Sequence, residues 1–236
     1  MKGYISQYKK SNFQNLFDED IFVALYQSIL NNCFSLIQDG YIQYITDSEK
    51  LFLSDETQIT AGICGHIEDI INKQKLPFDI VPEFFVYSND IRKGKKNPKR
   101  AKRFDLKITT WNQSNEKFKF GVEAKLLAEN NHGSKIATTL IKEYVEDAGM
   151  GKFINNIYDP NSYNEGVMLG HILNGEVENI MKKINDKITS TYSNQECLSP
   201  HNNHYVSNYA DNGKKKNLYH IFLNFSTLAN NVDNTL

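Results

Sequence analysis

Apolar residues recur at helical spacing in two stretches near the start of the chain. The first runs from Glu19 to about Ile37 and predicts an amphipathic helix. The second is better delimited, because Ser54 suits an N-cap and the pattern ends near Lys73, before a proline. Its apolar positions are Ile59, Ile63, Ile67 and Ile70. Two helices are therefore expected before the first strand.

From residue 78 the sequence becomes rich in aromatic and β-branched residues, which predict strands. A strand is expected over 78–87, where Pro82 indicates a sheet edge or a bulge. Segments 103–111 and 117–127 alternate between apolar and polar residues, and the turn-forming residues 112–116 separate them. These two segments predict a β-hairpin.

The rest of the chain continues to mix helices with strands. We expect a helix over 138–154, a buried strand over 167–173, a second helix over 177–188 and a last strand over 218–225. The polar, Asn-rich segment 190–217 is expected to be a long loop. This order predicts an α/β fold with a mixed central β-sheet flanked by helices.

Length and composition favour one domain. A chain of 236 residues with 40% apolar content can bury one sizeable core. Residues 1–53 are expected to form a helical extension packed on a core domain of residues 54–236. The start of the chain lacks an apolar leader, and no stretch approaches the roughly 20 apolar residues that span a bilayer. We therefore expect a cytoplasmic protein without a membrane partner.

The strongest chemical signal is a pair of acids on the expected hairpin. Along 117–127 the period of two places Glu123 and Lys125 on the less apolar face, and along 103–111 it places Asp105 on the corresponding face. A hairpin centred on Ser114 sets Asp105 directly opposite Glu123, with their Cβ atoms about 5 Å apart.

Two carboxylates placed opposite each other repel, and a divalent cation removes that conflict. Mg²⁺ is typically held by one or two carboxylates together with water and substrate phosphate. Lys125 can stabilise the charge that develops on a phosphate. The competing interpretation is an ordinary solvated strand face, on which Lys107, Lys119 and Lys125 form cross-strand ion pairs with the two acids.

These residues resemble the PD-(D/E)XK nuclease superfamily. The motif reads Arg103-Phe104-Asp105-Leu106-Lys107 and Phe120-Gly121-Val122-Glu123-Ala124-Lys125, with Phe104 in place of the family's proline. The resemblance covers about residues 54–174 and implies a restriction endonuclease-like core with an extra N-terminal helix. It implies catalysis by Asp105, Glu123, Lys125 and Glu56, and metal binding at Asp105, Glu123, Glu56 and Ala124. Glu68 or Glu83 are the alternatives to Glu56.

A basic segment leads directly into Asp105. The net charge of −1 gives no global attraction to a polyanion, so nucleic-acid binding would depend on local clusters of cations. Residues 92–103 hold the densest such cluster, and Lys152 on the helix after the motif is a further candidate for contact with phosphates. The candidate nucleic-acid-binding residues of the segment are Arg92, Lys93, Lys95, Lys96, Lys99, Arg100, Lys102 and Arg103.

The sequence thus predicts a Mg²⁺-dependent deoxyribonuclease, with Mn²⁺ as a substitute metal. The resemblance points to DNA as the substrate and to restriction or anti-phage defence as the setting. A homodimer or partner subunits of a defence system are the expected assemblies. The alternative hypothesis is a catalytically silent nucleic-acid-binding or structural subunit of a defence complex.

Overall fold

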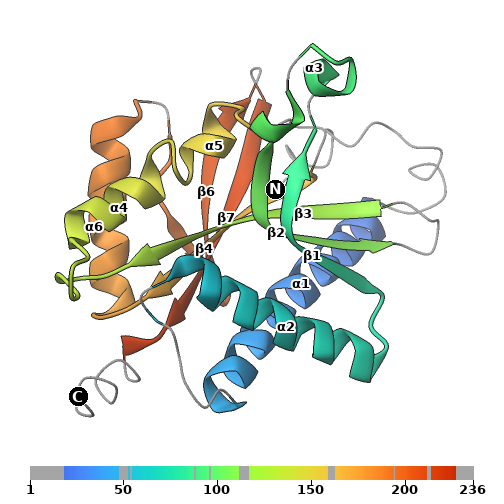
Figure 1. Ribbon diagram of the computed structural model, residues 1–236, viewed down its shortest axis with the longest axis horizontal. Helices are drawn as coiled ribbons and strands as arrows, with labels where there is room; N and C mark the ends of the chain where they lie inside the picture. Colours follow the sequence, from blue (N-terminus) through green and yellow to red (C-terminus); the bar gives the residue numbers. More distant parts are fainter. Residues whose placement is uncertain are drawn as a thin grey trace.

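The computed structural model describes residues 19–47, 53, 55–87, 89–95, 97–111, 117–158, 163–193, 195–211 and 214–226. These residues form a seven-stranded mixed sheet with helices on both faces (Figure 1). The helices are α1 (Glu19–Asp47), α2 (Glu56–Gln74), α3 (Asn89–Arg92), α4 (Ala137–Val145), α5 (Gly151–Ile154) and α6 (Val177–Thr191), with a 3₁₀ helix at Pro98–Arg100. The strands are β1 (Phe78–Val86), β2 (Lys102–Trp111), β3 (Lys117–Leu127), β4 (Glu165–Ile172), β5 (Ser199–His201), β6 (His204–Asp211) and β7 (Lys214–Asn224).

The sheet order is β1-β2-β3-β4-β7-β6-β5. Antiparallel pairs form its two sides, and the central strands β3, β4 and β7 run parallel. The chain crosses from β3 to β4 through α4 and α5, as a parallel pair requires. The predicted α/β class with a mixed, helix-flanked sheet is confirmed, and β1 lies at the sheet edge, as Pro82 indicated. None of the helices in the described ranges has the length and apolar character needed to span a membrane.

Two apolar clusters cover the two faces of the sheet. On one face α1 and α2 pack against the even-numbered residues of β3, including Phe120, Val122 and Ala124. On the other face α4, α5 and α6 pack over Phe104, Leu127 and residues of β4 and β7. Figure 1 shows α1 crossing α2 on one side of the sheet and α4 beside α6 on the other. The sheet therefore separates two hydrophobic layers.

The first helix extends well past its expected end near Ile37, to Asp47. A Cβ atom on Gly40 would lie 2.4 Å from Ile67 Cγ1, so the glycine lets α1 approach α2 closely. Beyond it Tyr44 remains buried in the same cluster. Gly40 thus allows a close contact between the two helices and does not end α1. The proposed boundary at residue 53 stays a prediction.

The helix expected over 138–154 is interrupted. α4 ends at Val145 and α5 begins at Gly151, with turns between them. A Cβ atom on Gly149 would lie 2.1 Å from the main-chain oxygen of Tyr144, so this tight turn requires glycine. The break redirects the chain that follows, including Lys152.

The prediction of a loop over 190–217 is wrong, because β5 and β6 lie within it. β6 pairs with β7 from Tyr205–His220 to Asp211–Lys214. Its side chains are largely polar, and Ser207 is buried with its hydroxyl 2.9 Å from His220 Nε2. Main-chain pairing and such polar contacts stabilise this strand. The strand therefore does not need the alternating apolar pattern by which the other strands were predicted.

Candidate active site

The first residue of α2 lies against the end of β3. Asp55, rather than the expected Ser54, is the N-cap, and its carboxylate accepts hydrogen bonds from the N–H groups of Thr57 (2.8 Å) and Gln58 (3.2 Å). The cap fixes Glu56 at the helix start. Glu56 Oε1 accepts a hydrogen bond from Lys125 Nζ at 2.8 Å, and its Oε2 accepts one from the Leu126 N–H at 3.2 Å. Glu56 therefore joins the predicted site.

Glu123 and Lys125 are in direct contact, as the alternation along β3 predicted. Lys125 Nζ lies 3.0 Å from Glu123 Oε1, and the two side chains are 10% and 0% exposed respectively. The same ammonium donates to the main-chain oxygen of Ala124. Lys125 thus joins two carboxylates that lie 67 positions apart in the sequence, Glu56 and Glu123.

Asp105 lies where β2 separates from β3. The hairpin register centred on Ser114 is confirmed from Trp111–Lys117 to Leu106–Val122, and the ladder stops one position short of Asp105 and Glu123. The turn, residues 112–116, lies outside the described residues. Asp105 Oδ2 instead accepts the N–H of Ala124 at 2.7 Å. The register therefore brings Asp105 to the Glu123 segment, with its carboxylate on the β3 main chain.

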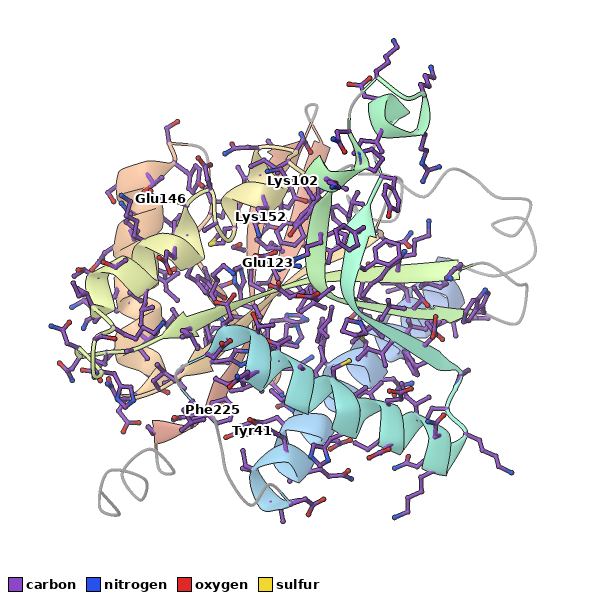
Figure 2. All side chains as sticks on the ribbon, in the orientation of Figure 1. Tyr41, Lys102, Glu123, Glu146, Lys152 and Phe225 are labelled. Carbon is purple, nitrogen blue, oxygen red and sulfur yellow. The ribbon has the colours of Figure 1, made fainter. Side chains whose placement is uncertain are left out.

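Two residues beyond α4 hold Glu123 from the opposite side. Lys152 forms an ion pair with Glu123 Oε1, and the hydroxyl of Tyr158 contacts Glu123 Oε2. The Tyr158 hydroxyl also lies 2.7 Å from the main-chain oxygen of Arg103. The Tyr158 ring packs on Phe104, with centroids 4.0 Å apart. Figure 2 shows Lys152 beside Glu123 near the centre of the molecule.

The alternation along the strands gave no sign of the contact between Tyr158 and Glu123. Tyr158 is buried in an aromatic cluster with Phe104. The aromatic character of these residues was the one sequence feature that could have indicated that Tyr158 lies in the core near the site. Lys152, expected at the phosphate backbone, is paired here with a carboxylate, and its contact with nucleic acid stays a prediction. Of the other glutamates, Glu83 pairs with Arg103 at 3.1 Å, and Glu68 lies exposed farther along α2.

Part of the basic segment lies beside this cluster. The main-chain oxygen of its last residue, Arg103, is connected to Glu123 through the Tyr158 hydroxyl. Within the described part of the segment the exposed residues are Arg92, Lys93, Lys95, Lys99, Lys102 and Arg103. Lys96 and the Arg100 side chain lie outside the description. The main chain of Arg103 therefore lies next to the acidic cluster, and its guanidinium group pairs with Glu83.

Comparisons with protein-family models, with curated proteins and with solved structures each find no match for this chain. Only the geometry and chemistry of the residues described above therefore indicate what this site does.

Burial and mutual repulsion shift the ionisation of the cluster. Desolvation raises the pKa of Glu123, Asp105 raises it further, and Lys125 and Lys152 oppose the shift. Desolvation also raises the pKa of Glu56, against the effect of Lys125. For Lys125 desolvation lowers the pKa, but Glu123, Glu56 and Asp105 together raise it above its ordinary value. Lys125 is therefore charged at neutral pH.

The donor set suits a hard cation. Glu56, Asp105, Glu123 and the Ala124 carbonyl offer oxygen ligands, and Mg²⁺ typically takes one or two carboxylates and keeps several waters. Three carboxylates face two ammonium groups, which leaves one negative charge uncompensated. Among the described residues no three His, Cys, Asp or Glu side chains converge as a metal site. Both ammonium groups contact Glu123 Oε1 and the Tyr158 hydroxyl contacts Oε2, so a cation bound at Glu123 would compete with these contacts.

Proposed function

We propose that this protein is a Mg²⁺-dependent nuclease that hydrolyses DNA phosphodiester bonds, of the PD-(D/E)XK type, acting in restriction or anti-phage defence. The contacts of Lys125 with Glu56 and Glu123, with Asp105 held on the adjacent Ala124 N–H, carry the proposal, because these residues come from one helix and two strands. Solvated faces seldom hold a fully buried carboxylate such as Glu123 beside a nearly buried lysine. Strongly perturbed ionisable groups of this kind cluster at functional sites.

Each of these residues would have a separate role in hydrolysis. Asp105, Glu123 and the Ala124 carbonyl would hold Mg²⁺, which supplies a Lewis acid for the phosphate and lowers the pKa of a bound water. Lys125 supplies a fixed positive charge for the phosphate oxygens, because its raised pKa keeps it protonated. It therefore acts as an electrostatic group rather than as a base. In the overall reaction a water oxygen joins phosphorus, the P–O bond to the leaving sugar breaks, and the leaving oxygen takes up a proton.

The other contacts position these groups. Glu56 fixes the Lys125 ammonium from the start of α2, and Tyr158 fixes Glu123 from beyond α5. The exposed cations of the basic segment would hold the nucleic-acid backbone beside the acids.

A second candidate function is that of a nucleic-acid-binding or structural subunit that catalyses no reaction. One observation favours it: the Lys125 and Lys152 ammonium groups already compensate Glu123, so the carboxylate does not need a metal to stay buried. The nuclease is preferred because the ion pairs leave the Asp105 carboxylate without a cation within salt-bridge distance among the described residues.

A cleavage assay separates the two candidates. Plasmid, linear duplex, single-stranded DNA and single-stranded RNA are incubated with the protein and Mg²⁺, Mn²⁺ or EDTA. Lys125→Met is the test variant, and Lys119→Met, on the same strand and six positions earlier, is the matched control. We expect metal-dependent cleavage that falls about 100- to 1000-fold in Lys125→Met and persists in Lys119→Met.

Cleavage at the same rate in a folded Lys125→Met variant would overturn the nuclease assignment. Binding without cleavage under every condition would favour the silent subunit. Circular dichroism of each variant establishes that the variant is folded.

A further inference from the structure

Two aromatic side chains at the end of the edge strand face solvent together. Phe85 is 42% exposed and Tyr87 is 46% exposed. Their rings stack with centroids 6.4 Å apart and planes inclined by 22°. The alternate residues Phe84 and Val86 point the other way, into the second apolar cluster. Phe85 and Tyr87 therefore contribute little to the core.

This aromatic pair is attached to the basic segment. Arg92 Nε donates a hydrogen bond to the main-chain oxygen of Tyr87 at 3.0 Å, which ties α3 to the end of β1. Phe85 pairs in register with Arg103. Between residues 83 and 103 the sequence has eight basic and two acidic residues. The exposed rings thus lie in positively charged surroundings.

The same strand pair leads to the acids. Arg103, the register partner of Phe85, presents its main-chain oxygen to Tyr158, whose hydroxyl also contacts Glu123. The Arg103 main chain therefore connects the strand pair that carries Phe85 to the residues that position the buried carboxylate.

We infer that Phe85 and Tyr87 form a stacking platform for unpaired bases, and that the site takes single-stranded DNA. Aromatic rings stack on any base, and basic side chains hold the backbone without reading sequence. A duplex hides its base faces and cannot use such rings. That the bound strand is also the substrate rests on the proposed nuclease function.

A second copy of the chain is a poorer occupant of this surface. A two-fold contact through the Phe85–Tyr87 pair would bring two basic segments together, and like charges facing each other weaken association. The polyanionic backbone of a nucleic acid instead complements the cations.

Binding of fluorescent oligonucleotides to the full chain in EDTA tests the inference without cleavage. The ligands are single-stranded DNA, the same sequence as a duplex, and the same sequence as RNA. The variants are Phe85→Ala, Tyr87→Ala and the double variant, with Tyr87→Phe as the conservative change. Trp111→Ala is the matched control, because Trp111 is 43% exposed, has the Lys117 ammonium 4.5 Å from its ring centroid, and lies at the opposite end of β2.

Each alanine variant should weaken single-strand binding about tenfold, equivalent to about 1.4 kcal/mol, and the double variant about 100-fold. Duplex binding should change less than about twofold, and Tyr87→Phe and Trp111→Ala should bind as the parent does. Quenching of 2-aminopurine in the strand should disappear in the double variant, because the quenching reports stacking.

Unchanged single-strand binding in the double variant would overturn the inference, as would an equal loss in Trp111→Ala or a parallel loss of duplex binding. RNA bound more than tenfold tighter than DNA would overturn the substrate class. A dimer in sedimentation that the double variant dissociates would assign the surface to self-association instead.

Failure of the proposed function gives a different result. Platform-dependent binding without cleavage would leave the stacking site in place and remove the nuclease. Cleavage of single strands that is unaffected by loss of both rings would leave the nuclease in place and remove the stacking site.

Discussion

The ion pair between Lys152 and Glu123 should contribute measurably to stability. Glu123 is fully buried, and Lys152 is 23% exposed. Replacement of Lys152 with Met keeps the long apolar stem and removes only the ammonium group. The carboxylate would then retain Lys125 at 3.0 Å and the Tyr158 hydroxyl.

The loss of stability in Lys152→Met depends on the contacts that Glu123 retains. Removal of one partner from a buried ion pair costs about 3–5 kcal/mol when the other charge is left uncompensated. Here Lys125 still faces the same carboxylate oxygen, so the loss is nearer that of one hydrogen bond to a charged group, about 2 kcal/mol. For a chain of this length that corresponds to a melting temperature lower by about 4–8 °C.

Urea unfolding in EDTA at several pH values measures this loss. The matched control is Lys142→Met, because Lys142 is 63% exposed and lies 3.9 Å from Glu146, so its removal should cost under about 0.5 kcal/mol. The cost of Lys152→Met should shrink as the pH falls and Glu123 becomes protonated, since Lys152 lowers the pKa of Glu123. Equal stability of the two variants at pH 7, or a cost that is independent of pH, would refute the role given to Lys152.

Three further predictions concern other parts of the site. Gly121→Ala should destabilise by about 1–3 kcal/mol in urea unfolding, because its Cβ would lie 2.5 Å from Phe104 Cζ; an unchanged midpoint would contradict this. Asp55→Ala should cost about 1 kcal/mol by removing the α2 N-cap, and Asp55→Asn, which also caps, should restore most of it. Burial raises the pKa of Glu56 and Glu123, so their contribution to metal-free stability is present at low pH and is lost as the pH rises through those raised values. Glu56→Gln should therefore gain stability relative to the parent between about pH 4.3 and neutrality, and a relative loss in equilibrium unfolding would contradict the desolvation argument.

Local patterns predicted the parts of the site that depend on neighbours in sequence. Strand alternation placed Glu123 beside Lys125, and the turn centred on Ser114 set the register that brings Asp105 to β3. Both results follow from the period of two and from short-range turn geometry. The resemblance selected Glu56, but its contact with Lys125 depends on how α2 lies against β3, which no local pattern specifies.

The contacts made after α4 were not predictable in this way. A glycine turn at Glu146–Met150 breaks the expected helix and sends Lys152 and Tyr158 toward Glu123. Helical periodicity cannot anticipate such a change of direction. β6 was missed for a related reason, because main-chain pairing with β7 stabilises a strand that has few apolar residues.

Replacement of Asp105 with Asn tests the proposed metal-dependent nuclease. The amide oxygen can still accept the Ala124 N–H that Asp105 holds at 2.7 Å, so the fold should persist while the charge is lost. Asp79→Asn is the control, because Asp79 is exposed on β1 and contacts Thr109 Oγ1 at 3.4 Å.

Mg²⁺-dependent DNA cleavage should fall at least about 100-fold in Asp105→Asn, since loss of several kcal/mol of charge stabilisation has that effect on rate. Asp79→Asn should cleave as the parent does. Cleavage by a folded Asp105→Asn variant at the parental rate would contradict metal binding by Asp105 and the proposed nuclease.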